Sequence, residues 1–149
     1  PSTPVWIGGR SKAAARRVGR VGDGWLVSSA TPAEISIGRD ILFKTADQYQ
    51  REIEEDHVGI LLGFYIDKNP TLATQKAEPY VTRHRPDVHF SELSALGTTD
   101  LICETIQNYI DAGAYKLVVR PLCSEEESLE QLEIMGSEIL PKFHNKVTT

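Results

Sequence analysis

The chain has 149 residues, of which 40% are hydrophobic and 25% are charged, a composition typical of one soluble globular domain. Its 16 Lys and Arg residues and 21 Asp and Glu residues give a formal net charge of -5, which argues against a nucleic acid or an anionic membrane as the main partner. No apolar run approaches the roughly 18 residues that cross a bilayer, and the start lacks a secretory signal. Two cysteines are too few for a disulfide framework, so we expect reduced thiols and a cytoplasmic location.

The first part of the chain alternates strand and helix signals. Residues 5–7 are a β-prone run that ends in glycines, and residues 11–21 follow with an amphipathic helical pattern and a serine at the cap position. Residues 25–27 form a second apolar run. The capping box at residues 31–34 then predicts a long helix that continues to about Glu55.

The middle of the chain contains its most apolar segment. Residues 58–66 read VGILLGFYI, as expected of a strand that helices cover on both faces. Residues 67–97 are less regular, apart from a short helix that Asn69-Pro70 can cap. We interpret residues 67–97 as an irregular insertion after the third strand.

The last part of the chain repeats the alternation. A helix opens at Gly97-Thr98 and stops at Gly113, a strand follows at 115–119, and an S-x-x-E capping box at Ser124 starts the final helix. The periodicity of this final helix predicts one apolar face, made by Leu129, Leu132, Gly136, Ile139, Leu140 and Phe143.

Four consecutive β-α units predict an α/β fold with a parallel sheet and right-handed crossovers, either open and doubly wound or part of a (β/α)-barrel. We expect a single domain over residues 1–149, with the insertion inside it. Both architectures place ligands at the C-terminal ends of the strands. Those ends are residues 8–11, 28–31, 66–69 and 120–124.

The segment Gly8-Gly9-Arg10-Ser11 has the parts of an anion site. Glycines let the backbone approach a phosphate, the free N–H groups and the positive dipole end of the next helix face it, and Arg10 and Ser11 add donors. The same residues also suit a plain tight turn with a helix cap. A dinucleotide fingerprint is absent, because neither the G-x-G-x-x-G spacing nor the later acidic residue is present.

Fewer signals point to chemistry elsewhere. Arg120 follows the fourth strand, where it can hold a phosphate or a carboxylate or form a salt bridge at a barrel rim. Trp6 and Trp25 are interpreted as core residues rather than cofactor platforms. The four histidines lack metal-ligand spacing, so no metal site is assigned. The Arg and His residues at 83–89 are interpreted as a solvated loop, with contact to an anionic substrate as the alternative.

The run Pro4-Val5-Trp6-Ile7-Gly8-Gly9-Arg10-Ser11, followed by Gly22-Asp23-Gly24-Trp25, resembles the bacterial luciferase-like monooxygenase family. Gly97-Thr98 before a helix, Ala112-Gly113-Ala114 before Leu117-Val118-Val119-Arg120-Pro121, and the closing Ile139-Leu140-Pro141 occur in the order that this family shows. The resemblance spans nearly the whole chain except residues 67–96. It implies the C-terminal half of a (β/α)8 TIM-type barrel that uses FMN or a deazaflavin for monooxygenation or hydride transfer on a small-molecule substrate.

By this resemblance, Gly8, Gly9, Arg10 and Ser11 hold the cofactor phosphate, and Arg120 lies near the mouth of the active site. No catalytic acid or base is identified. The four missing strands would carry the ring face of the cofactor and most substrate contacts, which puts the activity of the isolated chain in doubt. Open strand edges lead us to expect a homo-oligomer or a missing N-terminal half as partner. The alternative function is a non-catalytic half-barrel that binds an anion or a partner.

Overall fold

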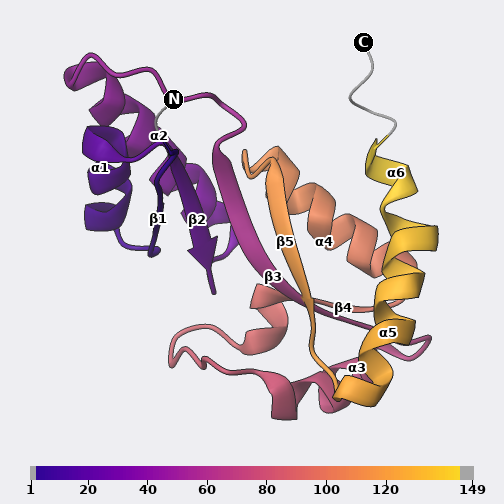
Figure 1. The fold of residues 1–149 in the computed structure, drawn as a ribbon. Helices are drawn as coiled ribbons and strands as arrows, with labels where there is room; N and C mark the ends of the chain where they lie inside the picture. Colours follow the sequence, from indigo (N-terminus) through magenta and orange to yellow (C-terminus); the bar gives the residue numbers. More distant parts are fainter. Residues whose placement is uncertain (1–2, 145–149) are drawn as a thin grey trace. The chain divides into compact units, whose positions relative to one another are not determined.

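Figure 1 shows the computed structural model, which describes residues 3–144 as strands that alternate with helices. Within this range the strands are β1 (Trp6–Gly8), β2 (Gly24–Ser28), β3 (Val58–Ile66), β4 (Ser94–Gly97) and β5 (Lys116–Pro121). The helices are α1 (Lys12–Val21), α2 (Pro32–Gln48), α3 (Pro70–Ala77), α4 (Thr99–Asp111), α5 (Glu125–Ile134) and α6 (Pro141–His144), with the 3-10 turns η1 (Glu78–Tyr80) and η2 (Phe90–Leu93) and the π-helical η3 (Met135–Ile139). Residues 1–2, which include the Pro1 start, and 145–149 lie outside the described range.

The strands pair in parallel. β1 pairs with β2, β2 with β3 and β3 with β4, and β5 also pairs with β3. In this last pair the N–H of Tyr115 donates to the carbonyl oxygen of Val58 at 2.9 Å, and that of Leu122 to Phe64 at 2.8 Å. The residue numbers of both partners rise together, as in a parallel ladder. The predicted α/β fold with a parallel sheet is therefore confirmed.

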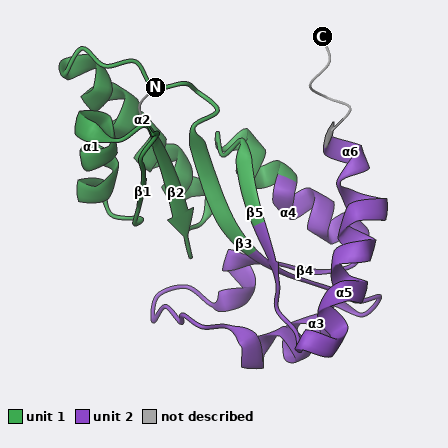
Figure 2. Ribbon diagram, in the orientation of Figure 1, with its two compact units in different colours: residues 1–62, 107–118 green, residues 63–106, 119–149 purple. Residues whose placement is uncertain are grey.

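The chain divides into two compact units, which Figure 2 shows in different colours. Unit 1 consists of residues 1–62 and 107–118, and unit 2 of residues 63–106 and 119–149. The single domain over 1–149 stays a prediction. Among the helices of residues 3–144, none combines the length and the apolar character that crossing a bilayer requires.

The core of unit 1 is built around Trp25. This side chain is 1% exposed, and Val18 of α1 and Leu42 of α2 are completely buried. Gly38 on α2 leaves room for the indole, because a Cβ atom at this position would overlap the ring. The predicted core role of Trp25 is confirmed, whereas Trp6 is only half-buried.

Helix α2 is shorter than predicted, because it ends at Gln48 instead of continuing to about Glu55. The backbone N–H groups of Gln50 and Arg51 turn back to carbonyl oxygens of its last turn, and Gln50 has a φ of 53°. This is the pattern of a Schellman stop. The Arg51 guanidinium then donates to carbonyl oxygens at the end of α1, at 2.7 Å in the case of Gly22. A tertiary contact thus uses a residue that the sequence pattern assigned to the helix.

In unit 2, the segment expected to be irregular contains α3, η1, η2 and β4. Asn69 caps α3 as predicted, because its side-chain oxygen accepts from the N–H groups of Thr71 and Leu72 at 3.0 and 3.2 Å. Strand β4 was not predicted. It has four residues, two of them Ser and Gly, and it forms by pairing with the last four residues of β3.

The final helical segment exposes side chains that its periodicity placed in the core. Leu129 and Leu132 are 67% and 44% exposed, whereas Gln131 and Ile139 are buried. The amide of Gln131 accounts for this: its oxygen accepts from the N–H of Ile66 at 2.7 Å, and its nitrogen donates to the Ile66 carbonyl oxygen at 3.0 Å. The predicted apolar face is therefore wrong at Leu129 and Leu132. Gln131 is buried instead, because its amide forms hydrogen bonds with the backbone of Ile66 inside the unit.

Candidate functional site

The β1–α1 loop, Gly8 to Ser11, lies at the C-terminal end of β1, and its residues are exposed. Gly9 has a φ of 103°, which glycine adopts without strain, and a Cβ atom there would also lie 3.1 Å from the Cβ of Ala14. Ser11 caps α1, since its Oγ accepts from the N–H of Ala14 at 3.1 Å. The loop therefore leads directly to the start of a helix whose first N–H groups have no partner within that helix.

A buried indole fixes the conformation of this loop. The Nε1–H of Trp25 donates to the carbonyl oxygen of Gly9 at 2.8 Å. Trp25 belongs to β2, which pairs with β1, and it is paired in register with Ile7. Because the indole is buried, water does not compete for this hydrogen bond. The loop is thus preorganised by the core of unit 1.

The neighbouring β2–α2 loop is also held by side chains of unit 1. Thr31 and Glu34 make the two reciprocal bonds of the predicted capping box, at 3.3 and 2.8 Å. The hydroxyl of Tyr109 donates to the carbonyl oxygen of Ala30 at 2.7 Å. Burial, with a smaller effect of the Glu34 carboxylate, raises the pKa of Tyr109 to about 12. The hydroxyl therefore keeps its proton, and this bond, at neutral pH.

The electrostatics of the β1–α1 loop favour an anion. Arg10 and Lys12 are exposed, and neither forms an ion pair with another residue of the described range 3–144. The first turn of α1 contains no acidic residue. Cations without an ion pair, free N–H groups and the positive end of the helix dipole all attract an anion.

Arg120, the remaining predicted site residue, belongs to unit 2. Its Nη2 donates to the carbonyl oxygen of Tyr80 at 3.2 Å, and the side chain is exposed. The structure thus gathers Gly8, Gly9, Arg10 and Ser11 in one loop of unit 1, whereas Arg120 holds a turn of unit 2.

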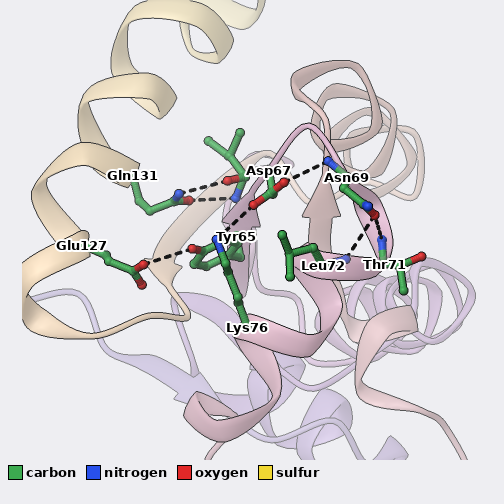
Figure 3. Close-up of polar contacts among 9 residues, drawn as sticks. Tyr65, Asp67, Asn69, Thr71, Leu72, Lys76, Glu127 and Gln131 are labelled. Carbon is green, nitrogen blue, oxygen red and sulfur yellow. Dashed lines mark hydrogen bonds and ion pairs between the residues drawn. The ribbon is translucent and has the colours of Figure 1, made fainter.

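A polar cluster that the sequence did not predict surrounds the C-terminal end of β3 in unit 2 (Figure 3). Lys76 Nζ lies 3.2 Å from Asp67 Oδ2, and the N–H of Asn69 donates to Asp67 Oδ1 at 2.9 Å. The hydroxyl of Tyr65 donates to Glu127 Oε1 at 3.4 Å. One local signal existed, because Asp67 directly follows a buried strand and its partners Asn69 and Lys76 lie two and nine residues further along the chain. The Glu127 carboxylate, by contrast, comes from a distant part of the chain.

These contacts shift pKa values inside the cluster. The Asn69 N–H and then the Lys76 side chain lower the pKa of Asp67, and Asp67 and Tyr65 raise the pKa of Lys76. Burial raises the pKa of the Tyr65 hydroxyl. Asp67 and Lys76 therefore stay ionised near neutral pH, and Tyr65 stays protonated. None of the three is poised to exchange a proton there.

One group of possible metal ligands in the described residues is bound by neighbouring residues. Glu54, Asp56 and His57 place possible ligand atoms within 4.8 Å of one another. Asp56 Oδ2, however, lies 2.7 Å from Lys116 Nζ, and Nδ1 of His57 lies 2.7 Å from the carbonyl oxygen of Asp23. We assign no metal ion to this group.

The 83–89 segment in unit 2 has internal contacts of its own. Arg85 binds the carboxylate of Asp87, and the rings of His84 and His89 lie 6.4 and 4.6 Å from that of Phe90. His89 also accepts from the N–H of Ser91 at 3.3 Å, which starts η2. Contact of this segment with an anionic substrate stays a prediction.

Comparison with protein families gives one assignment. A family model described as luciferase-like monooxygenase matches residues 1–118, most of the chain. A search of curated protein sequences gives no match.

Solved structures with the same fold are about twice as long as this chain. The coenzyme F420 dependent tetrahydromethanopterin reductase from Methanopyrus kandleri has a TM-score of 0.68 at 17% identity, over 94% of this chain and 51% of the reductase. The oxygenating constituent of 3,6-diketocamphane monooxygenase from Pseudomonas putida, in complex with FMN, has a TM-score of 0.72 at 13% identity, over 95% and 49%. The monooxygenase RslO1 from Streptomyces bottropensis has a TM-score of 0.71 at 13% identity, over 96% and 49%. This coverage confirms the predicted fold as half of a (β/α)8 barrel.

Proposed function

Because the chain belongs to the luciferase-like monooxygenase family, we propose that it forms the C-terminal half of a flavin- or deazaflavin-dependent oxidoreductase and that the β1–α1 loop binds the cofactor phosphate. The observation that carries the proposal is this loop itself. It combines exposed glycines, the start of α1 and an Arg10 side chain without an ion pair in residues 3–144. Two solved relatives support the cofactor class, since one is F420 dependent and the other was solved with FMN.

The residues of the loop fit a phosphate group. A Cβ atom at Gly8 would make only an ordinary contact, 3.5 Å from the carbonyl oxygen of Leu26, so Gly9, with its φ of 103°, is the position that needs glycine. Arg10 offers a fork of donors, and the N–H groups at the start of α1 offer more. The bond from Trp25 to Gly9 holds the loop in this form before any ligand arrives, so little ordering accompanies binding.

In the proposed reaction, the cofactor when bound supplies the redox chemistry, as hydride transfer or oxygen activation. The role of this chain is to hold and orient the cofactor through its phosphate. The described residues of the loop include no carboxylate or imidazole that could serve as a general acid or base. The acid and base, the choice between FMN and a deazaflavin, and the substrate then depend on a second half, either another copy of this chain or an N-terminal half. We also propose a cytoplasmic location, in keeping with the free thiols of Cys103 and Cys123.

A titration of the chain with FMN, a deazaflavin and inorganic phosphate tests the proposal. We expect saturable quenching of cofactor fluorescence and competition by phosphate. Gly9→Val, which forces a β-branched residue to a φ of 103°, is expected to weaken cofactor binding at least about tenfold. Gly136→Val is the matched control, because nothing lies within 4 Å of a Cβ atom at Gly136.

Unchanged affinity in the folded Gly9→Val variant would show that the loop is only a turn. Phosphate binding without any flavin or deazaflavin affinity would instead support the alternative, a non-catalytic half-barrel that binds an anion. Absence of binding by all three ligands would contradict both.

A further inference from the structure

Helix α1 carries cations on one side and packs against α2 with the other. Gly19 lets the two helices approach closely, since a Cβ atom there would lie 2.6 Å from the carbonyl oxygen of Leu42. The opposite side, which we term the basic face, is exposed and carries four cations: Lys12, Arg16, Arg17 and Arg20. The basic face therefore belongs to a helix that the core of unit 1 holds in place.

No residue between 3 and 144 forms an ion pair with the cations of the basic face. Residues 1–22 contain no Asp or Glu. The first acidic residue, Asp23, accepts from the N–H of Val5 at 2.7 Å and lies 3.5 Å from the Arg51 guanidinium. Since the chain as a whole has a net charge of -5, the basic face is a local excess of the opposite sign.

Most of these cations do not stabilise the helix that carries them. Lys12 lies in the first turn, where the positive end of the helix dipole disfavours a cation. Lys12 and Arg16, like Arg16 and Arg20, are four residues apart, so their charges repel each other. Only Arg20, in the last turn, has the charge that the dipole favours. The positions of the cations therefore suit a negatively charged ligand better than they suit the helix.

The basic face begins at the proposed phosphate loop. Arg10 and Ser11 directly precede Lys12, and the next cations of the row are Arg16 and Arg20. A helix rises 1.5 Å per residue, so this row offers a cation about every 6 Å over about 12 Å. A phosphate in the loop would lie at one end of the row. Negative groups that continue from such a phosphate would meet one cation after another.

The spacing of the row matches a chain of glutamates joined through their side-chain carboxyl groups. Each unit of such a chain adds five main-chain bonds, so an extended chain advances about 6 Å for each free carboxylate. The two proposed cofactor classes differ at this point. FMN ends at its phosphate, whereas a deazaflavin of the F420 type continues from its phosphate into glutamates of this kind. Two or three glutamates span the row.

From these observations we propose that the basic face of α1 binds carboxylates that continue from the cofactor phosphate, so that the cofactor is a deazaflavin with an acidic tail rather than FMN. This inference rests on the proposed function, because the phosphate in the β1–α1 loop fixes where the tail begins. A guanidinium can bind a carboxylate through two parallel hydrogen bonds. Each exposed pair contributes little by itself, and three pairs together give a gain in affinity of about tenfold.

Fluorescence titrations with deazaflavins of different tail length test this subsite. The set consists of a deazaflavin without glutamates, forms with one, two, three and five glutamates, and FMN. We expect the affinity to rise at least about tenfold over the first two or three glutamates and then to level off. FMN should bind like the form without glutamates. About 0.5 M NaCl should remove most of the gain, since salt screens exposed charges.

Neutral variants locate the gain on the basic face. Arg16→Gln/Arg20→Gln should bind all tail lengths with affinities equal to within about threefold, and glutamine keeps the helix favourable. Arg20→Gln alone should lose only the contribution of the last glutamate that the row can reach. Lys44→Gln/Lys142→Gln, which removes two positive charges at exposed positions outside α1, should keep the wild-type dependence on tail length. Circular dichroism confirms that each variant is folded.

Three results would overturn the inference and leave the proposed function intact. One is a wild-type affinity that does not change with tail length. Another is a full gain from the tail in the folded Arg16→Gln/Arg20→Gln variant. The third is tighter binding of FMN than of the deazaflavin with three glutamates. Absence of binding by every cofactor would instead contradict the proposed function, and this inference with it.

Discussion

Two strand-to-helix turns of this molecule both end in a polar residue that caps the next helix, and they differ in the side chains that precede it. In unit 1, β1 leads through Gly8 and Gly9 to a helix capped by Ser11, and in unit 2, β3 leads through Asp67 to a helix capped by Asn69. The first turn exposes glycines and cations without ion pairs in residues 3–144. In the second, the acidic side chain is already bonded to a backbone N–H and to a lysine.

The difference shows what makes such a turn available to a ligand. A capped helix start favours anions in both cases, but at β3 the chain supplies its own carboxylate, since Asp67 accepts from the N–H of the cap residue Asn69. At β1 the corresponding residues have no negative side chain, as the proposed phosphate site requires. The turn in unit 1 is held by a buried tryptophan, and the turn in unit 2 by bonds between its own polar groups.

The largest expected effect comes from disturbing the tryptophan that supports the β1–α1 loop. Gly38→Ala places a methyl group in the space of the Trp25 ring, so the ring must move and its bond to Gly9 is lost. We expect the free energy of unfolding to fall by about 3 kcal/mol. Urea denaturation followed by tryptophan fluorescence measures it. Gly136→Ala, at an open helical position, is expected to change stability by at most about 1 kcal/mol, and equal losses in both variants would refute this account.

The support of the neighbouring loop by Tyr109 predicts an alkaline transition. The unfolded side chain loses its proton near pH 10, whereas the folded one keeps it to about 12, so this contribution to stability is complete below pH 10 and is lost as the pH rises through 12. The wild type should lose about 2 to 3 kcal/mol over this interval through Tyr109. Tyr109→Phe removes this contribution, so the free energies of unfolding of the variant and of the wild type should approach each other as the pH rises. Parallel curves between pH 10 and 12 would contradict the prediction.

In unit 2, Gln131→Leu removes the two hydrogen bonds between the Gln131 amide and the backbone of Ile66. The N–H and carbonyl groups of Ile66 lose their partners inside the unit. We expect a loss of about 2 kcal/mol in the free energy of unfolding and faster hydrogen exchange of the Ile66 amide. Gln75→Leu, at an exposed position of α3, should change stability by no more than about 0.5 kcal/mol. Unaltered hydrogen exchange of the Ile66 amide would show that the Gln131 hydrogen bonds do not protect this part of β3.

The smallest effect is expected at Asp67, because its partner Lys76 is exposed and solvent screens the ion pair between them. Its lowered pKa means that its contribution is present above the ordinary pKa of an aspartate and is lost as the pH falls through the folded value. The melting temperature of the wild type should therefore fall on acidification more steeply than that of Asp67→Asn. Asp47→Asn, on the exposed side of α2, should keep the wild-type pH dependence. If Asp67→Asn keeps it as well, the Asp67 bonds contribute nothing measurable.

Local signals allowed the sequence alone to determine most elements and the candidate phosphate loop. The capping box at Thr31 and the uninterrupted apolar run 58–66 act over a few residues, and the structure has both as predicted. The loop from Gly8 to Ser11 was equally readable, because a glycine turn and a helix cap need only adjacent residues.

Other features depended on tertiary contacts between residues far apart in the chain. Helix α2 stops at Gln48 while Arg51 binds the end of α1, and α5 turns Gln131 inward and Leu129 outward because the amide completes the hydrogen bonds of Ile66, 65 residues away. Periodicity ranks side chains by polarity only, and so it assigns a glutamine to the surface and a leucine to the core. Only the tertiary structure shows that a buried backbone needs the glutamine, since an unsatisfied N–H or carbonyl group costs more than an exposed leucine.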